Sequence, residues 1–411
     1  MSVITITSIL VTFCALFAYF NYRFVGLPTA IGIMVMALVT SGIILILPHV
    51  GVDILPVARR LMEHVNFSEA LLHGMLSFLL FAGALHVDWK TLHFHKNIVF
   101  VLAFAGTVFS TAAVGLIVYH VFPFLGVHID FAYALVFGAL ISPTDPIAVM
   151  AILKKAGVPE SLEIKVVGES LLNDGIAVVL FLSLLGVAHE GHAEASHVLL
   201  LFAEEAVGGA VLGGVLGYIA FLLLRSVDNY QVEIFLTLAL VMGGYELARE
   251  IHTSGPIAMV VAGLIVGNIG RELAMSDHTK ENLDNFWELA DEFLNAVLFL
   301  LIGFELLLIP FDQNAFHAGL FMIPALLAVR YVSVFVPVKF LERCRTFSPG
   351  AVNILTWGGL RGGLSVALVL SLPSGDIRDT LLLVTYCIVM FSIIVQGLTI
   401  GKLARWHNKA G

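Results

Sequence analysis

The sequence predicts an all-α polytopic membrane protein with about thirteen transmembrane helices, because of its composition, its long apolar runs and the placement of its basic residues. The 411 residues are 59% hydrophobic and only 12% charged, whereas a soluble domain carries about 25% charged residues. The apolar runs are nearly continuous and of helix length, unlike the short alternating segments of a transmembrane β-barrel. The low basic content argues against nucleic-acid binding.

Polar residues divide the chain into about thirteen apolar segments. The first segment lacks the basic region and cleavage site of a signal peptide, so we expect a retained helix. Two further segments, 54–66 and 271–284, are predicted to be interfacial and amphipathic. The thirteen segments cover residues 3–20, 28–48, 67–87, 97–122, 130–154, 162–187, 197–225, 231–250, 255–270, 285–309, 314–341, 349–373 and 380–403.

Most of the basic residues lie in every second connecting loop, which is one of the two sets of loops that face opposite sides of the membrane. An odd number of spans places the two chain ends on opposite sides. Because Lys and Arg favour cytoplasmic loops, we expect a cell-membrane protein with its N-terminus outside and its C-terminus in the cytoplasm. The richer set holds Arg23, Lys90, Lys96, Lys154, Lys155, Lys165, Arg225, Arg271, Lys280, Lys339, Arg343, Arg345, Lys402, Arg405 and Lys409. The poorer set holds Arg59, Arg60, Arg249 and Arg378.

One predicted outer loop is rich in His and Glu and has no basic residue. A His/Glu loop could bind a metal or sense pH, but a solvated acidic loop is the favoured interpretation. The three cysteines are scattered and suggest neither a disulfide framework nor a metal motif. The loop residues are His189, Glu190, His192, Glu194 and His197.

Two of the apolar segments contain residues that break helices. Residues 142–146 (SPTDP) interrupt the fifth segment and residues 358–363 (GGLRGG) interrupt the twelfth, because Pro removes a backbone donor and Gly weakens a helix. Either break alone is compatible with a kinked structural helix. Together they occupy the fifth position of the first six and of the last six segments, which predicts two inverted six-helix repeats with broken helices 5 and 12. The seventh segment is then a linker.

The sixth segment contains residues 168–174 (GESLLND), two of which are carboxylates at membrane depth, where charge is costly. In a helix, Ser170 and Asp174 share one face. Small hard cations prefer oxygen ligands, so Asp174, Ser170 and the freed backbone near Thr144 form a candidate site for such a cation. Asp174 would hold either a proton or a cation, and this competition is already an exchange mechanism.

Other charges inside the spans have electrostatic interpretations. Glu169 is predicted to pair with Arg330, because an unpaired buried charge would be more costly. Asp145 and Arg361 lie at the two breaks. Asp145 can offset the partial positive charge at the N-terminus of a half-helix, and Arg361 can offset the partial negative charge at a C-terminus. Asp291, with the adjacent Glu292, could line a cytoplasmic vestibule, although a solvated helix end is favoured.

Three motifs together resemble the cation:proton antiporter-1 family, which includes NhaP-type sodium/proton antiporters and animal sodium/proton exchangers. They are residues 142–146, 168–174 and 357–362 (WGGLRG). The resemblance implies a thirteen-helix, NhaA-like antiporter fold with inverted repeats, a homodimer and elevator-type movement of a core domain. It implies dimerisation regions at 1–96 and 231–310, core regions at 97–196 and 311–411, and a linker helix at 197–230.

The resemblance also implies roles for single residues. Asp174 is similar to the family's ion- and proton-binding carboxylate, with Thr144 and Ser170 near the ion, which implies a sodium site at these three residues. Asn173 is similar to the residue that marks the electroneutral branch, and Glu169 with Arg330 to its buried ion pair. The chain departs from the family at Ala82, where many members carry an acidic residue.

The sequence therefore predicts a secondary transporter, not an enzyme, that exchanges sodium or lithium for protons without net charge movement and without a cofactor. Its partners are monovalent cations, protons, lipid and a second copy of the chain. Potassium/proton exchange is the alternative, and a cation channel is more distant because broken helices in two repeats do not suit a continuous pore. A paired nucleophile and base, or a His-Glu-x-x-His motif, would indicate an intramembrane enzyme or metalloprotein, and we find neither.

Overall fold

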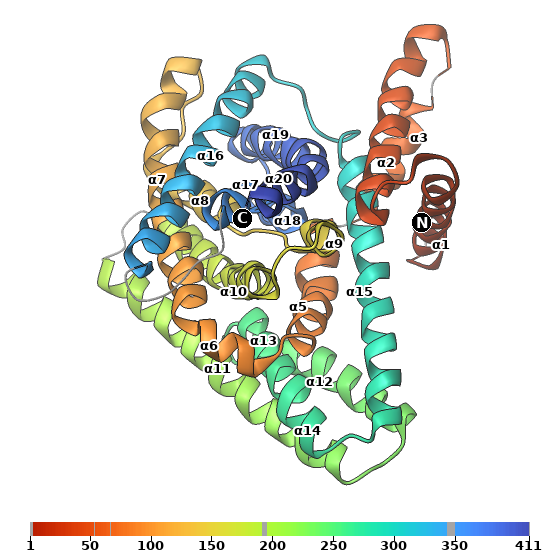
Figure 1. Cartoon of the computed structure of the whole chain (residues 1–411). Coiled ribbons are helices and arrows are strands. Elements are labelled where there is room, and N and C mark those ends of the chain that lie inside the picture. Colours follow the sequence, from red (N-terminus) through yellow and green to blue (C-terminus); the bar gives the residue numbers. More distant parts are fainter. Residues whose placement is uncertain (1–2, 53, 66, 191–194, 343–349, 411) are drawn as a thin grey trace.

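The computed structural model describes residues 3–52, 54–65, 67–190, 195–342 and 350–410, and this part of the chain contains helices, turns and connections but no strand (Figure 1). Its first helices are α1 (Val3–Phe20), α2 (Thr29–Ile46), α3 (Leu55–Glu63), α4 (Phe67–Glu69), α5 (Leu76–Leu85), α6 (Trp89–Phe100), α7 (Gly106–Val121), α8 (Phe131–Ile141), α9 (Ile147–Ala156) and α10 (Glu160–Glu190). They are followed by α11 (Ala195–Arg225), α12 (Tyr230–Glu250), α13 (Gly255–Ile265), α14 (Arg271–Leu273), α15 (Asp277–Glu305), α16 (Gln313–Leu341), α17 (Ala351–Trp357), α18 (Gly363–Leu370), α19 (Asp376–Phe391) and α20 (Gly397–Ala410).

Short π-helical and 3₁₀-helical segments extend or join several of these helices. The wider π turns shift the face that a continuous helix presents to its neighbours. In this way η4 joins α6 to α7, and η7 joins α19 to α20. The π segments are η1 (Asn21–Val25), η3 (Ala70–Met75), η4 (Val101–Ala105), η6 (Val266–Gly270) and η7 (Ser392–Gln396), and the 3₁₀ segments are η2 (Leu47–Val50) and η5 (Phe122–Leu125).

Within the described residues, ten helical segments are long and apolar enough to cross a membrane, which confirms the predicted all-α polytopic fold class. The count of thirteen spans and the inverted repeats stay predictions. Three predicted spans are not among the ten: the fifth and twelfth are each divided into two short helices, and the tenth, in α15, is acidic in its first half. The ten segments are Ile4–Val25, Thr29–Val50, Phe67–Leu85, Trp89–Leu125, Ser161–His189, Phe202–Arg225, Tyr230–Glu250, Gly255–Leu273, Gln313–Leu341 and Asp376–His407.

Two helices begin earlier than the predicted spans because polar residues cap them. The side chain of Ser276 accepts a hydrogen bond from the Thr279 amide, so α15 begins at Asp277, inside the segment predicted to be a separate amphipathic one. The side chain of Asp88 accepts from the Thr91 amide at 2.7 Å and starts α6. Hydrogen bonds from Thr91 also hold the pKa of Asp88 below its usual range. Residues 191–194 of the predicted His/Glu loop lie outside the described residues.

The helices pack in two groups around the broken segments (Figure 1). One group contains α1, α2, α5, α12, α13 and α15, and the other contains α7, α8, α10, α16, α18 and α19 together with α9, α17 and α20. The long helix α15 contacts α2, α5 and α12 within its own group and also α18 of the other group. It therefore lies at the boundary between the groups, beside the second break.

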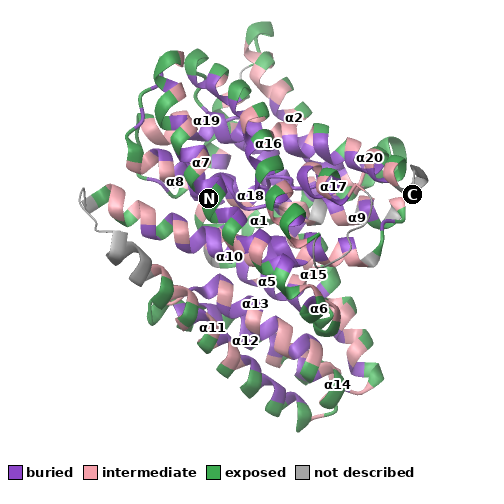
Figure 2. Cartoon of the chain, turned by 60° about the vertical axis from the view of Figure 1, so that its left-hand side comes forward, coloured by how far each residue is buried: buried purple, intermediate pink, exposed green. Residues whose placement is uncertain are grey.

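Large apolar side chains are also exposed on outward faces, as expected of a protein whose solvent is lipid. Figure 2 shows exposed residues along the outer side of α11, opposite the buried residues of the centre. Because these residues recur every three or four positions, they form one helix face. On α11 this face carries Val207, Val211, Val215, Tyr218 and Leu222.

Candidate functional site

The two breaks meet each other at the centre of the molecule. Residues 142–146 separate α8 from α9, and residues 358–362 separate α17 from α18. The amide of Asp145 donates a hydrogen bond to the carbonyl of Leu360 at 2.8 Å, which joins the two unwound segments. A Cβ atom on Gly362 would lie 2.4 Å from Asp145 Oδ2, so only Gly allows this close approach. The carboxylate of Asp145 thus lies at the start of α18.

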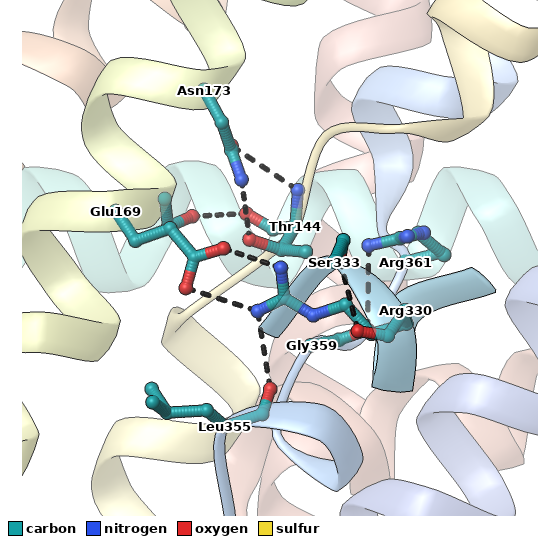
Figure 3. Close-up of polar contacts among 9 residues, drawn as sticks. Thr144, Glu169, Asn173, Arg330, Ser333, Leu355, Gly359 and Arg361 are labelled. Carbon is teal, nitrogen blue, oxygen red and sulfur yellow. Dashed lines mark hydrogen bonds and ion pairs between the residues drawn. The ribbon is translucent and has the colours of Figure 1, made fainter. Parts of the chain in front are cut away.

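Helix α10 holds the first unwound segment through Thr144 (Figure 3). The Ser170 hydroxyl donates to the Thr144 carbonyl. The Asn173 side chain binds the same residue at two points: its Nδ2 donates to Thr144 Oγ1 at 2.8 Å, and its Oδ1 accepts from the Thr144 amide at 3.3 Å. Backbone groups freed by the break are therefore satisfied by side chains one turn apart on α10. Both ends of the Asn173 amide are engaged with Thr144.

Asp174 differs from its polar neighbours on α10 in its accessibility. Glu169, Ser170 and Asn173 are each 1% exposed, whereas Asp174 is half-buried. Its carboxylate interacts electrostatically with Asp145 and Arg361. Of these four side chains, Asp174 is the one that is not fully buried and that forms no hydrogen bond or ion pair with another described residue.

The carboxylate of Glu169 faces Arg330 of α16 and forms a buried ion pair with it (Figure 3). Both guanidinium ends take part: Arg330 Nη1 donates to Glu169 Oε1, and Nη2 donates to Oε2 at 3.0 Å. Arg330 Nη2 also donates to the carbonyl of Leu355 at 3.1 Å. The pair links α10, α16 and α17, and such two-point pairs combine strength with fixed geometry.

Arg361 lies in the second break and is 2% exposed. Its Nη1 donates to the carbonyl of Gly359 at 3.4 Å, close to the C-terminal end of α17. The last carbonyl of α17, on Trp357, accepts from Gln396 Nε2 at 3.0 Å. Sequence reasoning missed Gln396, although an amide within the apolar segment 380–403 was an available signal for it.

Helix α15 brings further polar groups to the crossing. Asp291 is half-buried and interacts electrostatically with Asp145, whereas Glu292 is exposed. Asn295, one turn later, is 2% exposed and was also missed, although it too is an amide inside an apolar run. At the position where the family resemblance predicts an acidic residue, Ala82 is buried on α5 and supplies no ligand.

Gly359 is a sensitive position, because a Cβ atom there would lie 2.6 Å from Arg330 Nε. We expect Gly359→Ala to displace the guanidinium from Glu169 and Leu355 and to destabilise the protein by about 1–3 kcal/mol, as overpacking does. Thermal unfolding in detergent measures the effect. The matched control is Gly42→Ala, because a Cβ atom at Gly42 meets nothing within 4 Å. Equal stability of the two variants would contradict this packing.

The donor set at the crossing suits a small hard cation better than a transition metal. Asp174, Ser170 and Thr144 offer carboxylate, hydroxyl and backbone oxygens. Among the described residues, no group of three or more His, Cys, Asp or Glu side chains is placed to hold a metal ion.

Comparisons with known proteins agree with this geometry. Residues 9–406 match the family model described as "Sodium/hydrogen exchanger, transmembrane". The chain is 51% identical over 396 residues to the Na(+)/H(+) antiporter NhaP of Pseudomonas aeruginosa, covering 95% of this chain and 93% of that protein. It is 37% identical over 380 residues to the Na(+)/H(+) antiporter NhaH of Halobacillus dabanensis, covering 90% and 91%.

The fold is also found among solved structures. The sodium proton antiporter MjNhaP1 from Methanocaldococcus jannaschii at pH 8 matches with a TM-score of 0.70 and 18% identity, covering 92% of this chain and 98% of that chain. Because the family model extends over nearly the whole sequence, and the relatives are matched over most of their length, the chain belongs to the sodium/hydrogen exchanger family.

Proposed function

We propose that this protein is a secondary antiporter that exchanges sodium, or lithium, for protons across a membrane. One observation carries the proposal: Asp174 is a half-buried carboxylate beside the buried side chains of Ser170 and Asn173, where helix α10 contacts the two crossing breaks. The relatives named as Na(+)/H(+) antiporters support the choice of ions. Potassium for sodium is the alternative, because the oxygen ligands alone do not fix the ion radius.

In the proposed mechanism a proton and a cation compete for Asp174. The Ser170 hydroxyl uses its hydrogen toward the Thr144 carbonyl, which leaves its oxygen lone pairs available to a cation beside Asp174. The cation replaces the proton, so the site holds one positive charge in either state. Arg361 and Asp145, both close to Asp174, keep the local charge balanced. Asn173 acts by positioning Thr144.

Transport requires the site to face each side of the membrane in turn. We assign this movement to a core domain formed by residues 97–196 and 311–411. It would slide past a dimerisation domain formed by 1–96 and 231–310, with 197–230 as the linker. The more extensive packing within each helix group than between them supports this division. We further propose a homodimer in the cell membrane, with the N-terminus outside and the C-terminus in the cytoplasm, as the distribution of Lys and Arg indicates.

The function is tested with purified protein in liposomes that contain a pH-sensitive dye. An imposed sodium gradient is expected to move protons in the opposite direction, at a rate that saturates with sodium concentration. Lithium and potassium gradients in parallel establish the ion preference. Faster exchange with potassium would select the alternative, flux that does not saturate and is not coupled to protons would indicate a channel, and no flux would contradict the proposal.

Electroneutrality is a separate expectation, and it depends on Asn173, which leaves Asp174 as the single titratable group of the pair. We expect Asn173→Asp to make exchange sensitive to membrane potential, because a second proton can then accompany each cycle. Moving one charge through 100 mV changes its free energy by about 2.3 kcal/mol. Exchange rates at clamped potentials of zero and of about −100 mV measure the effect.

The same measurement on Asn97→Asp is the control for an added carboxylate, because Asn97 is exposed. Wild-type protein and this control are expected to show equal rates at both potentials. A voltage-sensitive wild type would contradict electroneutrality. A voltage-insensitive but active Asn173→Asp variant would show that Asn173 does not set the stoichiometry.

A further inference from the structure

One face of α15 carries a row of four polar residues that ends in a leucine at the crossing of the two breaks. Spacings of three and four residues place the members of a row on the same side of a helix. At its far end Leu298 lies against Gly363, the first residue of α18, since a Cβ atom on Gly363 would lie 2.4 Å from Leu298 Cδ1. The row consists of Asp284, Glu288, Asp291, Asn295 and Leu298.

The acidic members of this row differ in their surroundings. Asp284 accepts a hydrogen bond from Arg271 and has His86 Nε2 at 3.8 Å, so its charge is already compensated. Glu288 is exposed to solvent. Asp291 is half-buried and forms no ion pair with another described residue. Asp291 is therefore the carboxylate of the row that is both close to the crossing and uncompensated by a basic residue.

Asn295 adds a second and independent feature beside Asp291. Its Nδ2 donates to the Asp291 carbonyl at 2.8 Å, and its side chain interacts with the Asp291 carboxylate. The amide oxygen, Oδ1, is buried and has no hydrogen-bond partner among the described residues. A buried acceptor without a donor is unfavourable, and a cation is a partner that would satisfy it.

Two electrostatic interactions connect this position with the proposed transport site. Asp291 interacts electrostatically with Asp145, and Asp145 interacts with Asp174. We propose that the Asp291 carboxylate and the Asn295 amide oxygen form an outer binding position for a monovalent cation on its way to Asp174. The inference rests on the proposed antiport function. Carboxylate and amide oxygens are suitable ligands, and water completes the coordination.

The outer position raises the cation concentration beside Asp174 and takes no part in proton release. A group of carboxylates in a low-dielectric cleft raises the local concentration of counter-ions by about tenfold or more. We therefore expect Asp291→Asn to raise the sodium concentration that gives half-maximal exchange roughly tenfold, with the maximal rate within about twofold of wild type. Asp291→Glu, which keeps the charge, is expected to restore most of the apparent affinity.

The experiment measures initial exchange rates in proteoliposomes against sodium concentration at a fixed pH gradient, at low and high concentrations of an impermeant salt. The variants are Asp291→Asn, Asp291→Glu and Asn295→Ala. The matched control is Glu292→Gln, which removes the same charge from an exposed side chain one residue away. Added salt is expected to weaken the apparent sodium affinity of wild type more than that of Asp291→Asn, because salt screens the attraction. A purely structural role for Asp291 would not produce this difference.

Two results would overturn the outer position. One is an apparent sodium affinity of Asp291→Asn equal to that of Glu292→Gln, and the other is a loss of maximal rate without a change in affinity. If Asp291→Asn does not fold, the outer position is overturned by an apparent sodium affinity of Asn295→Ala that equals that of wild type. Failure of the antiport function itself looks different, because wild-type protein would then show no sodium-driven proton movement at all.

Discussion

Replacing Asp174 with Asn is expected to abolish sodium/proton exchange. The substitution keeps the shape of the side chain but removes the negative charge for which cation and proton compete. Loss of a group that only supports a metal ligand commonly weakens binding 10- to 100-fold, so loss of the charged ligand should reduce the exchange rate by more than about 100-fold. The rate is measured in proteoliposomes with an imposed sodium gradient.

The fold should survive this substitution, because Asp174 makes no ion pair within the described residues and lies at an accessible position. A control on the same helix is Glu163→Gln, which removes one carboxylate from a half-buried side chain near the start of α10. The control should keep near-normal exchange, and both proteins should unfold at temperatures close to that of wild type. Sodium exchange by Asp174→Asn at the normal rate would show that the ion binds elsewhere.

The sequence alone was sufficient for features that depend on local chemistry. Apolar runs identify membrane helices, and Pro or Gly clusters identify breaks, because both effects act within a few residues. The ion pair between Glu169 and Arg330 was also predictable, although the residues are 161 positions apart. A membrane interior leaves few basic partners for a buried carboxylate, and Arg330 and Arg361 were the only two Lys or Arg residues well inside the predicted spans.

Other features depend on how distant segments approach each other, and the sequence does not encode them in a local pattern. The hydrogen bond from Asp145 to Leu360 requires both breaks to meet. The two contacts of Asn173 with Thr144 depend on the exact rotation of α10 against the break. The family resemblance implied that Asn173 influences stoichiometry, and the structure adds that its side chain holds the unwound backbone at Thr144.

Helix α15 shows a different limit of sequence reasoning. Acidic residues in the first half of a membrane helix are typical of a helix end that is exposed to water. The favoured interpretation of Asp291 and Glu292 was therefore a solvated helix end. The structure separates the two residues: Asp291 interacts with Asp145, and Glu292 is exposed. Neighbours in sequence point to different faces of a helix, so their surroundings become distinct only when the packing of α15 is known.

Breaking the buried ion pair between Glu169 and Arg330 is expected to lower the free energy of unfolding strongly. Arg330→Met should destabilise the protein by about 3–5 kcal/mol, because it leaves the Glu169 carboxylate buried without a partner. The double variant Glu169→Leu with Arg330→Met should be more stable than Arg330→Met alone, since both charges are then removed. It should not recover fully, because the Leu355 carbonyl also loses its donor. Thermal unfolding in detergent compares the two.

An exposed pair that begins on the same helix provides the matched control. Lys339 Nζ lies 2.7 Å from Glu342 Oε2, with side chains that are 57% and 39% exposed. Because water screens such pairs, Lys339→Met should change stability by less than about 1 kcal/mol. The contrast separates burial from charge pairing as the cause: both variants remove one cation from α16, but only Arg330→Met leaves a carboxylate in a dry site. If Arg330→Met unfolded at the same temperature as Lys339→Met, the ion pair would not be what holds α10, α16 and α17 together.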